Sequence, residues 1–408
     1  MKPEAKKIAA FGITYNSLRM LIGSFSVLYL LSNGLDIVDV GLIKSLQALI
    51  IFTLDIPLSY LADKYSRKVS VLLGMTSGAV WLLISALASN KTSFYAAEFF
   101  NALSMIFYNN AFFAYLISSE KTEGASNIQV LLSKVTKIQF FMMGICALIG
   151  SMFVDVSSSS IWYLSALLVA MLTVSGFMLL PTDKVIHSTE KTPLKSMIYN
   201  DLKKIRNLAL YSNRELRLVF LRFLSVNVFY QIIIQFWQPL SDHAIKLSDI
   251  SIDNGKAFTY GILFVFILMV QSCASILTEK VKKTRVIITL LVLLDLFASL
   301  LLWLSVESRY GFIMFSLSLL MLFFTNRAAC TVTQSIIYDS APDEIRATTS
   351  AALATVVRIF VFIIMPLVSI ALHRLGYVTV LYLVMLYVCM LYLRKSEPKI
   401  KSTEISSA

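Results

Sequence analysis

Long uninterrupted runs of apolar residues constrain the fold of this chain more than any other feature. Residues 8–32, 69–88, 130–154, 161–180, 286–304 and 376–393 each approach or exceed the roughly 20 residues that a helix needs to cross a bilayer. A segment inside a bilayer must satisfy its own backbone hydrogen bonds, so only helices and closed β-barrels cross it. Barrel strands are short and alternate apolar with polar residues, and these runs do not alternate. They therefore predict an all-α membrane protein.

Composition agrees with a membrane location, because 57% of the 408 residues are hydrophobic and only 15% are charged. Soluble domains average about 45–50% apolar and about 25% charged residues. All four cysteines lie inside apolar runs, where a free thiol behaves as a small hydrophobe; they are Cys146, Cys273, Cys330 and Cys389. We therefore expect no metal site and no cofactor.

The whole chain contains about twelve segments that can span a bilayer at roughly 20 residues each. We place them at 9–32, 39–60, 69–89, 93–117, 130–153, 160–181, 217–240, 257–278, 286–305, 310–337, 347–372 and 376–394. The first segment carries Arg19 and lacks a small-residue cleavage site, so we expect it to remain in the mature protein.

One long polar segment divides these spans into two equal sets. The expected organisation is a six-helix bundle over 1–181, a cytoplasmic linker over 182–216, a second six-helix bundle over 217–394 and a tail over 395–408. The linker is either an amphipathic helix lying on the membrane or a solvated connection, and its sequence leaves both open.

Basic residues alternate in number from loop to loop. Clusters such as 64–68 and 280–285 lie on the side of the N-terminus. The other side holds only Lys91, Lys246, Lys256, Arg309 and Arg374. Cytoplasmic loops are enriched in Lys and Arg, so we expect both termini in the cytoplasm. The short loops and modest length lead us to expect a bacterial inner membrane. The formal charge of +12 thus follows topology and does not indicate nucleic-acid binding.

The two halves carry similar loops after their second span. Residues 59–71 read SYLADKYSRKVSV, and residues 275–287 read SILTEKVKKTRVI. Weak internal symmetry of this kind is typical of transporters built from two related bundles. We expect Asp63 to lie at the start of the third span, where a carboxylate can accept from free helix-start amides, with Arg67 four residues later.

Residues 59–68 resemble the signature of the major facilitator superfamily, Gly-x-x-x-Asp-Arg/Lys-x-Gly-Arg-Arg/Lys. Four positions match, with serine in place of both glycines; the matches are Asp63, Lys64, Arg67 and Lys68. The resemblance implies a secondary transporter whose two halves form a pseudo-symmetric pair, with this motif as a cytoplasmic latch between them. It also implies that the first, fourth, seventh and tenth spans line a central cavity. We expect a monomer.

Polar side chains gather on those four spans, whereas the sixth and twelfth are almost wholly apolar. The substrate-binding candidates, together with one residue of the eleventh span, are Tyr15, Asn16, Arg19, Asn101, Tyr108, Asn109, Asn227, Gln231, Gln235, Asn326, Arg327 and Arg358. An ionisable residue in a bilayer costs about 2.5–3.5 kcal/mol on insertion scales, so it is usually paired or functional. For Arg19 and Arg327 a structural ion pair is the alternative.

Arginine outnumbers carboxylate at mid-depth, which favours a substrate with an anionic group. Asp55 and Glu98 are the candidates for binding a coupling proton, since a carboxyl in apolar surroundings can hold one. Asp295 lies mid-span with no partner that the sequence identifies. Lys134 and Arg222 are expected to extend their cationic groups to the headgroups.

The functional expectation is proton-coupled export of a small organic, drug-like or peptide-like molecule. Uptake of an organic anion or nutrient is the alternative. The chain lacks the proline of the Gly-Pro signature of drug/proton antiporters in span 5, and Glu98 stands where many of them carry arginine. It has no His-Glu-x-x-His motif and no phosphate-binding glycine loop, so we expect no enzymatic activity.

Overall fold

The computed structural model describes residues 1–120, 125–152, 155–182, 214–248, 255–280, 284–306, 308, 310–340 and 346–392. All regular elements in these ranges are helices. They are α1 (Pro3–Arg19), the 3-10 helix η1 (Met20–Ile22), α2 (Ser26–Ser32), α3 (Ile37–Tyr65), α4 (Arg67–Leu87), α5 (Lys91–Glu120), α6 (Ala125–Met152), α7 (Ser160–Leu179), α9 (Arg214–Leu247), α10 (Lys256–Lys280), α11 (Thr284–Leu304), α12 (Gly311–Ser340), α13 (Arg346–Leu375) and α14 (Tyr377–Tyr392). The predicted all-α fold is confirmed.

Nine of the described helices are long and apolar enough to cross a membrane. The other predicted spans do not meet this criterion of length and apolar character, each for a different reason. The first is divided into α1, η1 and α2, α5 is rich in polar residues, and α14 is a shorter apolar helix. Each of the predicted segments thus corresponds to a helix or, for the first, to a broken helix.

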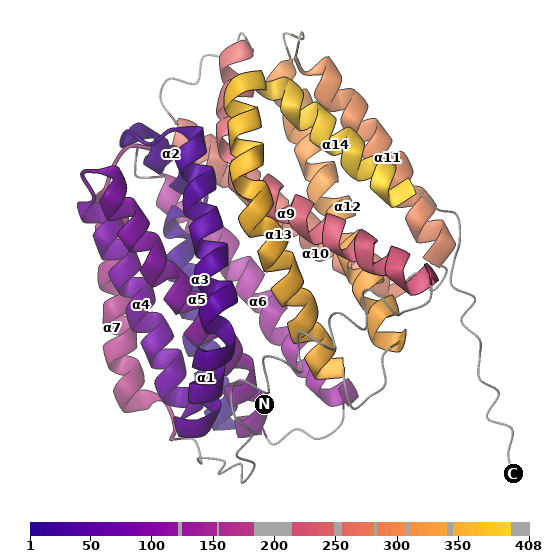
Figure 1. The fold of residues 1–408 in the computed structure, drawn as a ribbon. Helices are drawn as coiled ribbons and strands as arrows, with labels where there is room; N and C mark the ends of the chain where they lie inside the picture. Colours follow the sequence, from indigo (N-terminus) through magenta and orange to yellow (C-terminus); the bar gives the residue numbers. More distant parts are fainter. Residues whose placement is uncertain are drawn as a thin grey trace, which may run out of the picture.

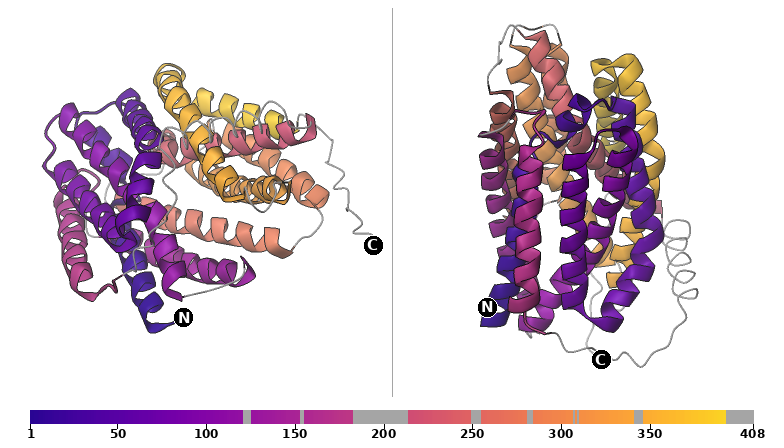
Figure 2. Two further views of the ribbon diagram at one scale, coloured as in Figure 1. Left: turned by 60° about the horizontal axis from the view of Figure 1, so that its bottom comes forward. Right: turned by 90° about the vertical axis from the view of Figure 1, so that its left-hand side faces the viewer.

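Helices α1–α7 and α9–α14 form two bundles that lie side by side (Figures 1 and 2). Between the bundles α3 packs on α13 and α6 packs on α10. Residues 183–213, and with them most of the expected linker, lie outside the described residues, as does the tail from residue 393.

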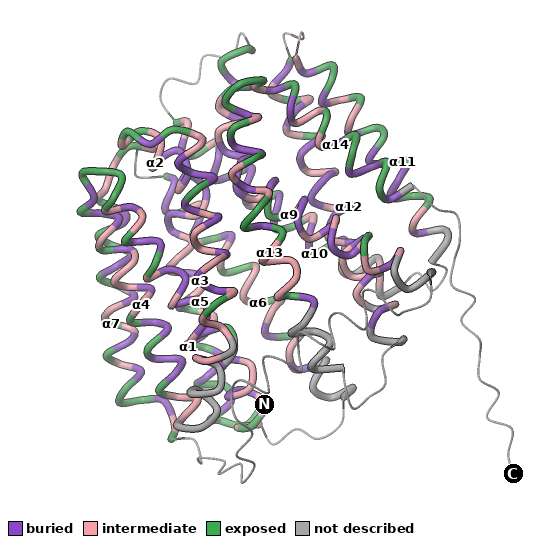
Figure 3. The backbone as a smooth tube through the Cα atoms, viewed as in Figure 1, coloured by how far each residue is buried: buried purple, intermediate pink, exposed green. Residues whose placement is uncertain are grey.

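Many residues on the outside of both bundles are exposed (Figure 3), and large apolar side chains are numerous among the exposed residues. Met178 is 82% exposed, Phe141 69% and Trp303 62%. An apolar surface of this extent would be unfavourable in water and matches the hydrocarbon of a bilayer.

The first span is broken where a side chain from the other bundle enters it. In a continuous α-helix the Val27 amide would donate to the Gly23 carbonyl, four residues earlier. Instead the Val27 amide donates to Oε1 of Gln238 on α9 over 2.8 Å, and Nε2 of Gln238 donates to the Gly23 carbonyl over 2.9 Å. The Gln238 amide therefore satisfies both backbone groups that the break frees.

Small residues allow helices of the two bundles to approach closely near the ends farthest from the N-terminus. A Cβ on Gly41 of α3 would overlap the Ser369 side chain and lie 3.0 Å from the Met365 carbonyl oxygen of α13. Likewise, a Cβ on Gly261 of α10 would overlap Ser151 of α6. With the Gln238 contact, these approaches close the molecule on that side.

The expected position of Asp63 at the start of the third span is wrong. Helix α3 continues to Tyr65, so Asp63 lies in its last turn, and Ser66 is the N-cap of α4, accepting from the Val69 amide at 3.2 Å. The side chains of Asp63 and Lys64 lie outside the described part of the structure.

The two later basic residues of the motif contact their own bundle. Nη1 of Arg67 donates to the Ala114 carbonyl of α5 over 3.4 Å. Nζ of Lys68 donates to the Leu180 carbonyl over 2.7 Å, at the carbonyl end of α7, where the helix dipole favours a cation. These contacts hold α4 against α5 and α7; a latch between the halves stays a prediction.

Candidate functional site

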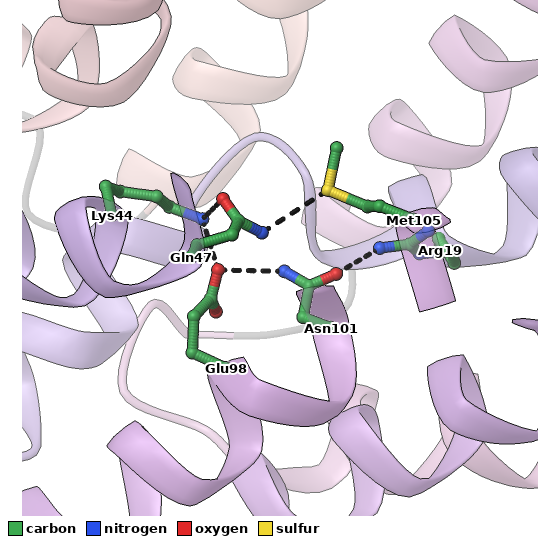
Figure 4. A network of polar contacts seen from close by, with 6 residues as sticks. All are labelled: Arg19, Lys44, Gln47, Glu98, Asn101 and Met105. Carbon is green, nitrogen blue, oxygen red and sulfur yellow. Dashed lines mark hydrogen bonds and ion pairs between the residues drawn. The ribbon is translucent and has the colours of Figure 1, made fainter. Parts of the chain in front are cut away.

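A polar network joins three helices of the first bundle (Figure 4). Nζ of Lys44 on α3 lies 2.8 Å from Oε1 of Glu98 on α5. The same carboxylate oxygen accepts from Nδ2 of Asn101 over 3.0 Å, and Oδ1 of Asn101 accepts from Nη2 of Arg19 over 2.5 Å. A continuous chain of contacts therefore runs from α3 through α5 to the end of α1.

Helical spacing creates the local parts of this network. Glu98 and Asn101 are three residues apart on α5 and share a face, as do Lys44 and Gln47 on α3. Nζ of Lys44 also donates to Oε1 of Gln47 over 3.3 Å, and Nε2 of Gln47 lies 3.3 Å from the sulfur of Met105. Spacing within each helix thus sets the local pairs, and the packing of α3 against α5 joins them.

Arg19 lies where α1 gives way to η1, and aromatic rings surround its guanidinium. The guanidinium carbon is 4.9 Å from the centre of the Trp81 ring and 5.5 Å from that of Tyr15. Such cation–π contacts stabilise a partly desolvated arginine. Its Nε is buried and has no hydrogen-bond partner among the described residues. Arg19 therefore retains an unused donor.

The network holds two cations, Arg19 and Lys44, and one carboxylate, Glu98. The Glu98 side chain is 7% exposed and that of Lys44 is 23% exposed, so water screens this charge weakly. One positive charge remains uncompensated within the network. An anionic group is the natural partner for such a site.

Tyr15 and Tyr108 are buried next to this network, and Asn16 is partly buried. The Tyr15 hydroxyl lies 2.6 Å from Oγ of Ser104, and Nδ2 of Asn16 donates to the Tyr108 hydroxyl over 3.1 Å. The Tyr108 hydroxyl in turn donates to the Gly12 carbonyl over 3.1 Å. In this conformation the hydroxyls of Tyr15 and Tyr108 connect α1 to α5, and the Tyr15 hydroxyl also accepts from Nη1 of Arg19 over 3.4 Å. Asn109, by contrast, is exposed.

The second bundle contributes a stripe of amides on α9. Asn227, Gln231 and Gln235 are spaced by four residues and so follow one face. Nδ2 of Asn227 donates to the Phe223 carbonyl over 2.8 Å, and Gln231 is exposed. Nε2 of Gln235 is buried without a hydrogen-bond partner among the described residues.

Arg327 on α12 is half-buried near that stripe. The ion pairs found among the described residues do not include Arg327. The Tyr230 hydroxyl donates to Oε1 of Gln271 on α10 over 3.2 Å. The preceding residue, Asn326, points into the bundle, where its Nδ2 donates to the Val226 carbonyl over 2.9 Å. The two neighbours thus differ: Asn326 joins helices, and Arg327 carries a charge that the described residues do not neutralise.

Comparison with known proteins identifies the family. A sequence model of the Major Facilitator Superfamily matches residues 8–366. The chain belongs to the major facilitator superfamily. No curated protein matches it. Within the described ranges, no group of His, Cys, Asp or Glu residues could hold a metal ion.

Solved structures of transporters share the fold. The nucleoside transporter NupG aligns with a TM-score of 0.77 at 12% identity, over 96% of this chain and 98% of that chain. A POT family transporter in complex with 5-aminolevulinic acid aligns with a TM-score of 0.71 at 15% identity, over 95% of this chain and 94% of that chain. At these identities the similarity shows the fold. Family and fold together support membrane transport by a multi-pass protein.

In this superfamily member both proton-coupling candidates pair with cations. Glu98 pairs with Lys44 inside the first bundle, whereas Asp55 on α3 forms an ion pair with Arg358 on α13, across the two bundles. The partners are 54 and 303 residues apart in the chain, so no local pattern could have matched them.

The sequence also does not identify the partner of Asp295. Asp295 is completely buried, and its Oδ1 accepts from Oγ1 of Thr325 on α12 over 2.5 Å. Its Oδ2 has no hydrogen-bond partner among the described residues. The spacing within α11 shows only that Asp295 is mid-span; the helix facing it is set by the fold of the bundle.

Proposed function

We propose that this protein is a proton-coupled secondary transporter that carries a small organic solute bearing an anionic group. We place it in the bacterial cytoplasmic membrane with both termini in the cytoplasm. The observation that carries the proposal is the uncompensated positive charge of the Arg19–Asn101–Glu98–Lys44 network.

Arg19 and Arg327 are the proposed binding residues. Arginine binds carboxylate or phosphate through two parallel hydrogen bonds, and Arg19 retains a buried donor without a partner among the described residues. Arg19 belongs to the first half and Arg327 to the second. A solute held by both would favour the arrangement in which the halves close around it, as alternating access requires.

Electrostatics suggests the sign of the coupling. A proton bound to Glu98 would remove the only carboxylate of the network and raise its net charge by one unit. Proton binding and anion binding would then favour one another, and the effect is reciprocal. Solute and proton would travel in the same direction, which is uptake when the proton gradient points inward. Export, which the loop motif favours, is the second candidate.

A comparison of metabolites in cells tests both directions. Cells expressing the wild type, Arg327→Gln or Arg374→Gln would be analysed for small molecules inside and outside. Arg374 is exposed at the end of α13 and is the matched control. A compound taken up by the wild type and the control, but not by Arg327→Gln, would support uptake, and accumulation outside would support export. Identical profiles with all proteins in the membrane would contradict the binding role of Arg327.

The coupling is tested once a solute is known. Glu98→Gln resembles the protonated site, so its transport should lose most of its dependence on a pH gradient while solute exchange persists. In wild-type proteoliposomes a pH gradient alone should drive accumulation. Unchanged pH-driven accumulation by Glu98→Gln would exclude Glu98 as the coupling group.

A further inference from the structure

A lateral groove opens between α9, α13 and α14 of the second bundle, with a volume of about 450 Å³. Figure 1 shows α13 diverging from the other two helices on this side. Apolar side chains such as Phe229, Ile232 and Leu383 form its walls. Residues at its rim are exposed on the lipid-facing surface, Leu221 and Leu386 by 55% each. The groove is therefore continuous with the space that the acyl chains of a bilayer fill.

The groove follows the first half of the apolar span of α9. Along α9 it extends from Leu218, where the apolar span begins, to Ile232. These 15 residues, 14 steps of about 1.5 Å each, correspond to about 21 Å of helix. Helix α9 begins on the side of the N-terminus, so the groove lies on that side of the second bundle.

Charge distinguishes the end of the groove nearest the headgroups. Arg222, one turn inside the apolar span, is the single charged residue in the described lining, and Ser225 follows on the same face. The lining contains no acidic residue. Basic pockets between membrane helices on the cytoplasmic side bind anionic lipid headgroups.

We propose that this groove binds an anionic phospholipid of the leaflet on the N-terminal side, with an acyl chain between α9, α13 and α14 and the phosphate at Arg222. The apolar walls and the opening to the bilayer fit an acyl chain better than a water-soluble solute. The site is separate from the Arg19 network. Because α13 also packs on α3, a lipid here would stabilise the spacing between α13 and α9.

Thermal unfolding of the purified full-length protein in neutral detergent tests the site. We expect phosphatidylglycerol to raise the melting temperature more than phosphatidylcholine does. Arg222→Gln should lower the apparent affinity for phosphatidylglycerol by about tenfold, as loss of a charge-assisted hydrogen bond predicts. Arg222→Lys should retain part of it. Lys137→Gln, which removes an exposed cation from α6, is the matched control and should behave as the wild type.

A second variant tests the groove itself. Leu386→Trp places a large side chain at the rim and should reduce stabilisation by phosphatidylglycerol while Arg222 is present. Native mass spectrometry of the wild type in an equimolar lipid mixture gives a readout that needs no variant, and should show phosphatidylglycerol retained preferentially. Equal retention of both lipids, or stabilisation unaffected by Arg222→Gln and Leu386→Trp, would overturn the proposal. Loss in Lys137→Gln equal to that in Arg222→Gln would do the same.

Discussion

Glu98 neutralises one of the two cations in a buried network. Replacing its carboxylate should therefore lower the stability of the protein even when no solute is bound. Glu98→Gln leaves Lys44 and Arg19 unopposed and should destabilise the protein by about 3 kcal/mol, the lower end of the range for breaking a buried ion pair. Thermal unfolding in detergent measures this loss. The double variant Lys44→Gln/Glu98→Gln should lose less than the sum of the single variants. Strict additivity would mean that the two groups do not interact.

Asp295 depends on one hydroxyl. Thr325→Val removes the hydrogen bond to Oδ1 and leaves both carboxyl oxygens unsatisfied in an apolar interior, at an expected cost of about 1–3 kcal/mol of stability. Thr333→Val is the matched control on the same helix. Its hydroxyl donates only to carbonyls of α12, so we expect a change of about 0.5 kcal/mol or less. In an Asp295→Leu background, Thr325→Val should have almost no effect; a persistent loss would assign the threonine another role.

At the scale of elements, Gln238 connects the broken first span to α9. Gln238→Ala frees the Gly23 carbonyl and the Val27 amide, so the two bundles should separate more readily on the side away from the N-terminus. Spin labels at Ser32 and Leu247, both exposed near that side, would report a longer and broader distance distribution.

The control for this experiment is Gln231→Ala, the same substitution at an exposed position of the same helix. It should leave the distance distribution unchanged. A Gln238→Ala distribution that matches the wild type would show that the glycine contacts at Gly41 and Gly261 suffice to hold this side closed.

At the scale of the whole molecule, the Asp55–Arg358 ion pair joins the two bundles. Asp55→Asn and Arg358→Gln should each lower the melting temperature, because each leaves a partly buried charge without its partner. The exchanged pair Asp55→Arg/Arg358→Asp should recover a large part of the loss. Lys246→Gln is the control: its ion pair with Asp242 lies on one helix, and the lysine is 65% exposed, so little should change. No recovery in the exchanged pair would indicate that the two residues act separately.

The sequence alone determined that this chain is a bundle of bilayer-spanning helices, because hydrophobic length and backbone hydrogen bonding act within each segment. It also placed the loop motif that matches the family. It misplaced Asp63, because the end of α3 depends on one turn of helix that hydropathy does not resolve. The partners of the buried polar groups, by contrast, depend on how the helices pack. Gln238 hydrogen-bonds to Gly23, which is 215 residues away in the chain, and Arg358 pairs with Asp55, which is 303 residues away. A buried charge requires a partner, but several cations could serve, and only the packing of the helices selects one.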